Sequence, residues 1–569
     1  MTDTYGKTQI LVIDDERLIR MTLSAKLRLI GYNAVCVAST AEAVTLLQNG
    51  GNRRFRAILT DIMMEGMDGF VFRDILRGLD STMPIFFMTA LDPEEGGGFL
   101  KRILEDANSY YLPKSVKVEV MLKRVQSIVA SRRVEQFIER QIEQSRQALA
   151  LAAHVQRSML PTRALMTERG FYTTWWQPKD TVSGDLYEAV PFGFGCYLYV
   201  LGDIQGHGTS AALAMTAVQS FLKQLTHREG APLMGPEDIA NLMQRFFRNN
   251  LLDVSYMTAL ICVHRPLQDE VRWISCGAPD LEVLDPMNRD MPPINPEHRG
   301  GIPIGLMPDT IYTADDVVTT HLTRTAMCVA YTDGVLDVSR DPEGMEQMPD
   351  EERRRIRNDL FYDARMNGSI AAAPYKFMEA CKAYGYTNFS DDVTELIFGA
   401  TIQLDGIFTG AVRIIPEEID KMAQQLGNWC TEQGWDVAVT TRVQLVFEEK
   451  MMNLHDHGYD DRERLHETAC VRLRKLQNHV ELTIWDCGTQ DPSISVAVGS
   501  TSVAFELANK MFGGRGRGRL MMREICNGIA RNRYGLLNET IFNIPLKVKD
   551  VEGLALGIEG LEGLEGVES

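Results

Sequence analysis

The strongest constraint on the fold of this chain is an acidic residue that recurs at the ends of short apolar segments. In one example, the apolar segment 197–201 is followed by Gly202, Asp203 and Ile204, and then by a Gly-His-Gly turn at 206–208. The apolar segment predicts a buried strand, and the residues from Ser210 onward predict a helix. Glycines beside a carboxylate let a metal ion or a phosphate approach the backbone closely. For this stretch alone, an acidic turn with a helix cap is the alternative interpretation.

Composition limits the classes of protein to consider. A chain of 569 residues predicts three to four domains, since domains usually hold ~100–200 residues. A net charge of −18 argues against non-specific binding to nucleic acid or to anionic membranes. The 10 cysteines form no CxxC pair and there is no HExxH motif, so neither a disulfide framework nor a zinc site is indicated. The polar N-terminus and the lack of an apolar run of ~20 residues lead us to expect a cytoplasmic protein.

Residues 1–128 alternate between strand-like and helical segments, an order typical of a parallel sheet with right-handed crossovers. The strand-like segments 9–13, 57–60, 84–88 and 110–112 end beside polar residues, which in such sheets gather at one ligand-binding edge. We expect Asp14 and Asp15 to hold a hard cation such as Mg²⁺. Asp61 is then the nucleophile that accepts a phosphoryl group, and Thr89 and Lys114 bind the oxygens of the new phosphate.

This first domain resembles the receiver domain of two-component response regulators. The matching positions are Asp14-Asp15, Asp61 with Met64 and Gly69 after it, Thr89-Ala90, and Lys114-Ser115. The family usually has proline after the lysine, whereas here Ser115 follows it and Pro113 precedes it. The resemblance implies a flavodoxin-like fold and phosphorylation of Asp61. It also implies a sensor histidine kinase or a phosphotransfer protein as the phosphodonor.

The connector, residues 129–164, has the composition of a long helix, with no glycine or proline between positions 134 and 159. Alternating steps of four and three residues from Val134 meet mostly apolar side chains, but Gln141 and Ser145 interrupt the seam. We expect this coiled-coil-like helix to form a homodimer or to rotate on phosphorylation of Asp61. A single helix packed on the next domain is the alternative.

Four acidic strand-end motifs recur in residues 165–402. They are Ser183-Gly184-Asp185, the stretch around Asp203, Thr332-Asp333-Gly334 and Asp391-Asp392. Carboxylates widely spaced in sequence at strand ends suit a site for two hard cations, because Mg²⁺ and Mn²⁺ prefer oxygen ligands. Such a pair activates water and neutralises a phosphoryl group.

These segments resemble the SpoIIE-like branch of metal-dependent serine/threonine protein phosphatases. The resemblance also rests on Ala153 to Pro161, Met257-Thr258-Ala259 and Gly301 to Gly305. It implies an αββα sandwich in which Asp203 bridges two metals, the Ile204 carbonyl adds a ligand, and Asp333 and Asp391 bind one metal. It further implies that Asp185 orients metal-bound water or a ligand, and we take Asp391 rather than the adjacent Asp392 as the ligand.

Two positions of this domain leave open questions. His207 is a candidate general acid for the leaving serine oxygen, and a structural, hydrogen-bonded histidine is the alternative. The family usually has Ala-Gly-His before a proline where this chain has Ser275 to Pro279, which affects the substrate-side loop but not the metal ligands. Hydrolysis of a nucleotide or a small ester is a further reading that the metal ligands alone do not exclude.

In the third domain, residues 405–548, the first candidate functional residues lie on a predicted helix. Glu449, Asn453 and His457 recur every four residues and therefore share one helix face. A strand at 480–485 leads into Asp486-Cys487-Gly488, and a glycine-rich stretch at 513–518 precedes another helix. Glycine-rich loops at helix starts hold phosphates through backbone N–H groups.

The third domain resembles the histidine-kinase-like ATPase fold, an α/β sandwich, of anti-sigma-factor serine kinases. The resemblance implies Mg-ATP as cofactor, with Asn453 on Mg²⁺, Glu449 as general base and Asp486 on the adenine amino group. The glycines that shape the nucleotide lid would be Gly488, Gly514, Gly516 and Gly518. Arginines 515, 517 and 519 stand where the family usually has apolar residues. We expect the acidic, repetitive residues 549–569 to form a mobile tail.

Together the three resemblances predict a multidomain α/β and α+β response regulator of a partner-switching pathway. We expect phosphorylation of Asp61 to shift the balance toward the phosphatase, which a C-terminal serine kinase opposes. The expected substrate of both is an anti-sigma-factor antagonist of the STAS type. In the alternative, the C-terminal domain only binds and sequesters a sigma factor or an antagonist, without turnover.

Overall fold

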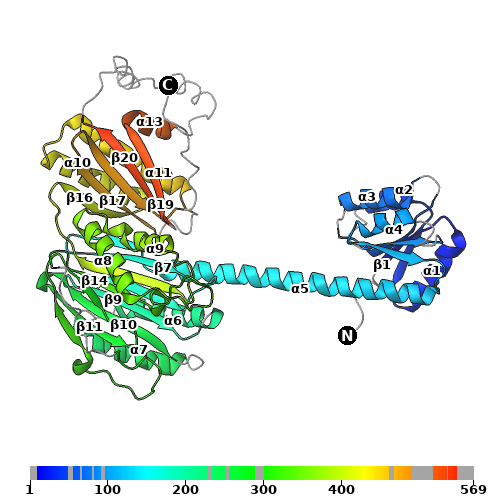
Figure 1. Cartoon of the computed structure of the whole chain (residues 1–569), viewed down its shortest axis with the longest axis horizontal. Helices are drawn as coiled ribbons and strands as arrows, with labels where there is room; N and C mark the ends of the chain where they lie inside the picture. Colours follow the sequence, from blue (N-terminus) through cyan, green and yellow to red (C-terminus); the bar gives the residue numbers. More distant parts are fainter. Residues whose placement is uncertain are drawn as a thin grey trace, which may run out of the picture. The chain divides into compact units, whose positions relative to one another are not determined.

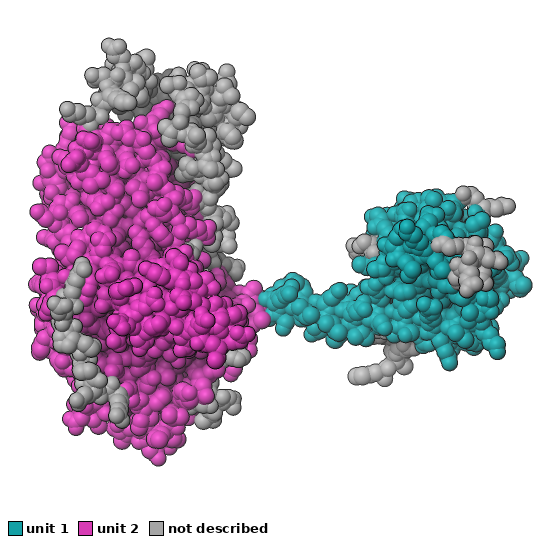
Figure 2. All heavy atoms as spheres, viewed as in Figure 1, with its two compact units in different colours: residues 1–148 teal, residues 149–569 magenta. Residues whose placement is uncertain are grey.

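The computed structural model describes residues 9–48, 55–64, 67–79, 82–90, 97–206, 208–226, 233–251, 256–288, 300–459, 467–488, 517–534 and 536–546. The chain divides into two compact units, residues 1–148 and 149–569 (Figure 2). No helix among these residues is long and apolar enough to cross a membrane.

The first unit is built on a parallel sheet of order β2-β1-β3-β4-β5 (Figure 1). Its strands are β1 Gln9–Ile13, β2 Asn33–Val37, β3 Phe55–Asp61, β4 Ile85–Thr89 and β5 Ser109–Pro113. Its helices are α1 Arg17–Leu29, α2 Thr40–Gln48, α3 Gly69–Leu79, α4 Gly97–Leu104 and the start of α5 Val118–Met159. The central strands are apolar on both faces because two hydrophobic clusters pack against the sheet. This arrangement confirms the predicted flavodoxin-like fold.

Helix α5 continues from the receiver into the connector as one helix of 42 residues. Met121, Leu122 and Val125 pack in the receiver core near its start. Ala153, near its end, packs with Val182 and Ala212 of the second unit. The predicted boundary at residue 128 therefore falls inside a helix, and it stays a prediction of where the receiver ends.

The second unit begins with two antiparallel sheets, of order β13-β11-β10-β9-β8 and β12-β14-β15-β7-β6. The strands of the first are β8 Asp185–Pro191, β9 Tyr197–Ile204, β10 Met257–Arg265, β11 Glu270–Cys276 and β13 Val318–His321. Those of the second are β6 Ala164–Met166, β7 Gly170–Gln177, β12 Glu282–Leu284, β14 Met327–Tyr331 and β15 Val393–Ala400.

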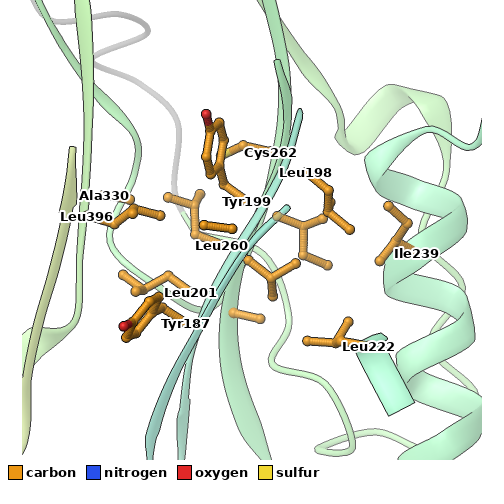
Figure 3. Packing of buried hydrophobic residues seen from close by; sticks show 14 of the residues in the cluster. Tyr187, Leu198, Tyr199, Leu201, Leu222, Ile239, Leu260, Cys262, Ala330 and Leu396 are labelled. Carbon is orange, nitrogen blue, oxygen red and sulfur yellow. The ribbon is translucent and has the colours of Figure 1, made fainter. Parts of the chain in front are cut away.

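Helices cover the outer face of each sheet. Helices α6 Thr209–Thr226 and α7 Pro236–Asn250 pack on the first, and α8 Asp350–Met366 and α9 Ala373–Ala383 lie with the second. Figure 3 shows that side chains of β9 point alternately toward the other sheet and toward the helices. Leu201 faces Leu396 of the other sheet, whereas Leu198 faces the helix that carries Ile239. This confirms the predicted αββα sandwich.

The C-terminal part of this unit is a third antiparallel sheet, of order β16-β17-β18-β20-β19, with helices on one face. The strands are β16 Ile407–Arg413, β17 Thr468–Lys475, β18 His479–Asp486, β19 Gly528–Tyr534 and β20 Leu537–Pro545. The helices are α10 Pro416–Glu432, α11 Val437–His457 and α13 Arg517–Ile525. This confirms the predicted α/β sandwich of the ATPase domain.

The other face of the third sheet packs against the αββα sandwich. Cys470, Trp485 and Leu537 belong to the same hydrophobic cluster as residues of α8, α9 and β14. The Thr468 hydroxyl donates to the Ala164 carbonyl over 3.1 Å. The domains predicted at 165–402 and 405–548 therefore share a core, and their exact boundaries stay predictions.

Candidate functional sites

The candidate phosphatase site lies where the two central sheets present the ends of four strands. The pairing of β8 with β9 sets Asp185 opposite Asp203. Asp333 opens a short 3-10 turn after β14, and Asp391 comes two residues before β15. Each acidic residue thus stands at a strand end, where the backbone leaves the sheet.

A hydrogen-bond network fixes Asp185 between the sheets. The hydroxyls of Thr332 and Thr394 both donate to Oδ2 of Asp185, over 2.8 and 2.6 Å. Thr332 N also donates to the Thr394 carbonyl, which joins the two threonine-bearing segments. Asp185 is only 1% exposed. Its second carboxylate oxygen is therefore held at a defined place on the site.

Two glycines of the motifs, Gly184 and Gly334, lie so close to a neighbouring backbone carbonyl that a side chain would crowd it. A Cβ on Gly184 would lie 3.0 Å from the Ile204 carbonyl oxygen, the predicted metal ligand. A Cβ on Gly334 would collide with the carbonyl of Asp392. Side chains at these positions would push apart the segments that carry the acidic residues.

The carboxylates of this site repel one another. Burial, then the charges of Asp333 and Asp391, raise the pKa of Asp203 to about 7. Burial and the charge of Asp203 raise the pKa of Asp185 well above its usual range. Buried carboxylates that destabilise one another are matched by cations, and their oxygens are the donors that Mg²⁺ and Mn²⁺ prefer. In donor type and in charge, the residues present therefore suit divalent metal ions.

The fit rests on donor type and electrostatics. Among the described residues, no group of three or more His, Cys, Asp or Glu side chains stands close enough to hold a metal ion. His207 lies outside the described residues, so its predicted role stays a prediction. Sequence reasoning assigned no role to Thr332, Thr394 or Gln156. Thr332 directly precedes Asp333, and Thr394 follows Asp392 by two residues, so their closeness in sequence to an aspartate was the available signal.

The receiver site brings three of its five predicted residues into direct contact. Nζ of Lys114 lies 2.5 Å from Oδ2 of Asp61 and 3.3 Å from Oδ2 of Asp14. Burial raises the pKa of the Asp14 carboxyl. Burial lowers the pKa of Lys114, but its hydrogen bond to Asp61 and the charges of both aspartates outweigh this and raise it overall. Lys114 N donates to the Thr89 carbonyl over 2.7 Å, and Asp15 is exposed beside the site.

The nucleotide site of the third domain is partly described. Asn453 Nδ2 donates to Glu449, over 2.7 Å to its carbonyl and 3.0 Å to Oε1, one turn earlier on α11. Asp486, 1% exposed, accepts at Oδ1 from Gly488 N and Asn538 Nδ2, each over 3.0 Å.

The second oxygen of Asp486 suits the predicted contact with adenine. It lies 3.4 Å from Nζ of Lys450 and accepts no hydrogen bond from the described residues. A buried acceptor of this kind fits the amino donor of a purine. Gly514 and Gly516 lie outside the described residues, and Gly518 falls within α13.

Comparison with known proteins divides the chain in the same way. Residues 10–126 match the model of the response regulator receiver domain, residues 194–400 that of stage II sporulation protein E, and residues 413–541 that of the histidine kinase-like ATPase domain.

Two similar curated proteins each match about a fifth of this chain. The response regulator MprA of Mycobacterium sp. (strain KMS) is 32% identical over 123 residues, which are 21% of this chain and 50% of the relative. A probable transcriptional regulator of Cyanophora paradoxa is 34% identical over 126 residues, 22% of this chain and 49% of that protein. The chain thus spans about half the length of these relatives.

Two similar solved structures share less than 20% sequence identity with this chain. The RsbU and RsbW domains of a Mycobacterium tuberculosis protein share 15% identity, with a TM-score of 0.37, over 68% of this chain and 95% of that one. The phosphatase domain of SpoIIE from Bacillus subtilis shares 17% identity, with a TM-score of 0.31, over 41% of this chain and 65% of that one. The three family matches, rather than these structures, show that this protein carries a response regulator receiver domain, a SpoIIE-type phosphatase domain and a histidine kinase-like ATPase domain, in that order along the chain.

Proposed function

We propose that this protein is a response regulator of a partner-switching pathway with two opposed outputs. Phosphorylation of Asp61 regulates a metal-dependent phosphatase that removes phosphate from a seryl or threonyl residue of a partner protein. The C-terminal domain is an ATP-dependent serine kinase that restores it. The substrate of both is an anti-sigma-factor antagonist of the STAS type.

The observation that carries the phosphatase proposal is the placement of acidic residues at the ends of two facing sheets. Strand pairing sets Asp185 opposite Asp203. Asp333 and Asp391 stand at the ends of the paired strands β14 and β15. Asp203, Asp333, Asp391 and the Ile204 carbonyl would hold two ions of Mg²⁺ or Mn²⁺. When bound, such a pair lowers the pKa of water and neutralises phosphoryl charge. Asp185, with one oxygen occupied by two threonines, keeps the other to orient the attacking water or a ligand.

The test is phosphate release from a candidate antagonist phosphorylated on serine. The full chain should release phosphate with Mn²⁺ and not with EDTA. Asp203→Asn should lower the rate by at least ~100-fold, because it removes charge from the bridging position. Asp315→Asn, an exposed acidic residue of the same domain, is the matched control. Release that persists in EDTA would contradict the proposal.

The contacts of Asp61 support its role as the phosphorylated residue. A sensor histidine kinase or a phosphotransfer protein would donate the phosphoryl group to a carboxylate oxygen of Asp61. Lys114 already lies against that carboxylate and would neutralise the phosphate, while Asp14 and Asp15 would hold Mg²⁺. Asp61→Asn should abolish any change of phosphatase rate on addition of a small phosphodonor such as acetyl phosphate.

The alternative for the third domain is binding without turnover, with a sigma factor, an anti-sigma factor or an antagonist as its partner. The hydrogen bonds from Asn453 to Glu449 favour this alternative. They join the proposed Mg²⁺ ligand to the proposed base, so neither side chain is free for its catalytic role. Transfer of labelled phosphate from Mg-ATP to the antagonist, lost in Glu449→Ala, would support the kinase. Binding of the antagonist with no transfer by the wild type would support sequestration.

We also propose that the chain forms a homodimer through α5. Several large apolar side chains of this helix are exposed in a single chain, although they recur at helical spacing. They are Val134, Phe137, Ile138, Ile142, Leu151 and Val155.

A further inference from the structure

The two adjacent aspartates at the start of β15 differ in their surroundings. Asp392 is 6% exposed, and each of its carboxylate oxygens accepts a backbone hydrogen bond over 2.7 Å. The donors are Lys179 N at Oδ1 and Gly184 N at Oδ2. Asp391 is partly exposed, and its Oδ1 accepts from Asp392 N over 2.8 Å.

The bonds of Asp392 tie together segments that are far apart in sequence. Gly184 directly precedes Asp185, and its carbonyl accepts from Ile204 N over 3.4 Å. The backbone carbonyl of Asp392 packs so closely on Gly334 that no Cβ fits there. Asp392 therefore contacts the residues next to Asp185 and Asp333, and through Gly184 it reaches the segment of Asp203.

The charge of Asp392 is unfavourable beside the other carboxylates of the site. It lies close enough to Asp203 and Asp185 to repel both carboxylates. Asparagine would remove this repulsion, but it could accept only one of the two backbone bonds and would turn an amide donor toward the other N–H. A side chain with two acceptor oxygens is thus needed to hold both segments at once.

We propose that Asp392 is a positioning residue of the phosphatase site, which clamps the 179–184 turn to the start of β15 and so sets the spacing of the metal ligands, while Asp391 is the ligand. The inference rests on the proposed phosphatase function and adds to it a residue that contacts neither metal nor substrate. Loss of the clamp should weaken metal binding without removing a metal, since partners that orient ligands typically contribute about 10- to 100-fold in affinity.

The experiment compares full-length wild type, Asp391→Asn and Asp392→Asn. Bound Mn²⁺ is counted by equilibrium dialysis over a range of free Mn²⁺, and hydrolysis of p-nitrophenyl phosphate is followed over the same range. The receiver contributes equally to the count in every variant. We expect Asp392→Asn to keep the wild-type number of Mn²⁺ with about 10- to 100-fold weaker binding. Its kcat should recover at saturating Mn²⁺ with an unchanged KM, whereas Asp391→Asn should bind one Mn²⁺ fewer.

Asp341→Asn is the matched control. Asp341 also accepts two backbone bonds, from Met345 N over 3.0 Å and Glu346 N over 2.6 Å, but on an exposed loop. It should bind Mn²⁺ as the wild type does. If Asp392→Asn does not fold, Lys179→Pro removes one donor of the clamp and should weaken Mn²⁺ binding with the count unchanged.

Three outcomes would overturn the inference. If Asp392→Asn lost a Mn²⁺ and Asp391→Asn did not, Asp392 would be the ligand. If Asp392→Asn matched the wild type in Mn²⁺ affinity and in the Mn²⁺ dependence of kcat, the clamp would have no positioning role. A wild type that bound no more Mn²⁺ than the Asp203→Asn variant would remove the proposed phosphatase site together with the inference.

Discussion

At the scale of single residues, the core of the phosphatase sandwich contains a histidine with an unusual environment. His264 of β10 is completely buried, and neither ring nitrogen has a hydrogen-bond partner among the described residues. Its ring lies near Tyr199 and Phe398. Burial lowers the pKa of His264 to about 4. The folded protein therefore keeps this imidazole neutral in mildly acidic solution.

This burial makes stability depend on pH. In the unfolded state His264 binds a proton below pH ~6.5, whereas in the folded state it binds one only near pH 4. The free energy of unfolding therefore falls as the pH is lowered through this range. The contribution is about 2 kcal/mol between pH 7 and pH 5. Urea unfolding of wild type and His264→Phe at both pH values measures it.

The comparison between the two proteins is needed because other buried groups titrate with the opposite sign. Burial raises the pKa of Glu188 and of Glu395 to about 7, so these carboxyls favour the folded state at low pH. Their contribution is the same in both proteins. An equal loss of stability between pH 7 and pH 5 in wild type and His264→Phe would contradict the assignment.

At the scale of elements, the end of α5 is hydrogen-bonded to the segment that precedes Asp185 in the candidate phosphatase site. Gln156, 1% exposed, donates from Nε2 to the Ser183 carbonyl over 2.6 Å and accepts from Ser183 N over 3.0 Å at Oε1. Ser183 stands two residues before Asp185. A displacement of this part of α5 would therefore also move the segment that carries Asp185.

Gln156→Ala should uncouple the helix from the site. It leaves both backbone groups of Ser183 unpaired in a buried place, at a cost of about 2 kcal/mol in stability. We expect the phosphatase rate to fall by about tenfold, because the turn before Asp185 loses its support. Gln147→Ala, an exposed position on the same helix, should leave the rate unchanged. Phosphate release at fixed Mn²⁺ is the measurement.

The exposed apolar face of α5 gives a second prediction at this scale. Ile138→Glu places a charge in the middle of the proposed dimer seam, so we expect the dimer to dissociate at micromolar concentration while the fold of each chain is retained. Light scattering of the full chain reports the mass. The control is Glu139→Gln, at an exposed neighbouring position. Equal masses for Ile138→Glu and the wild type would exclude this seam.

At the scale of the whole molecule, the phosphatase and ATPase domains are joined by more than a linker. Trp485 of β18 is 2% exposed within a cluster that includes residues of the phosphatase domain, and its indole N–H donates to Oε1 of Glu539 over 2.9 Å. The same oxygen lies 3.2 Å from Nζ of Lys376, on α9 of the phosphatase domain. Apolar and charged contacts therefore connect the two domains.

We expect these two domains to unfold together. Trp485→Ala should lower the free energy of unfolding by about 3–5 kcal/mol, because it opens a cavity in the shared core. Phosphatase activity and nucleotide binding should be lost at the same, lowered temperature. Trp435→Ala is the control, since Trp435 packs only in the core of the ATPase domain. Two separate transitions, with Trp485→Ala shifting only the ATPase one, would contradict this prediction.

The sequence alone was sufficient to predict the three folds and their order. Apolar segments that end in Asp14, Asp61 or Asp203 identify strand ends, because the period of burial and the position of the first charged residue are local properties. The absence of glycine and proline after position 134 predicted a long helix, and α5 confirms it. The sequence did not predict that one helix joins the receiver to the connector. When a helix continues past the end of a domain, no capping residue or glycine marks the domain boundary.

Only the tertiary structure decided which distant side chains meet. Asp185 receives its hydrogen bonds from residues 147 and 209 positions away, and Asp392 reaches Gly184 across 208 positions. Such contacts depend on the packing of whole sheets, which no local pattern records. The sequence by itself determined the strand ends and the carboxylates placed there. The pairing of strands and the packing of the two sheets decided which of those carboxylates face one another and which, like Asp392, are held by backbone N–H groups.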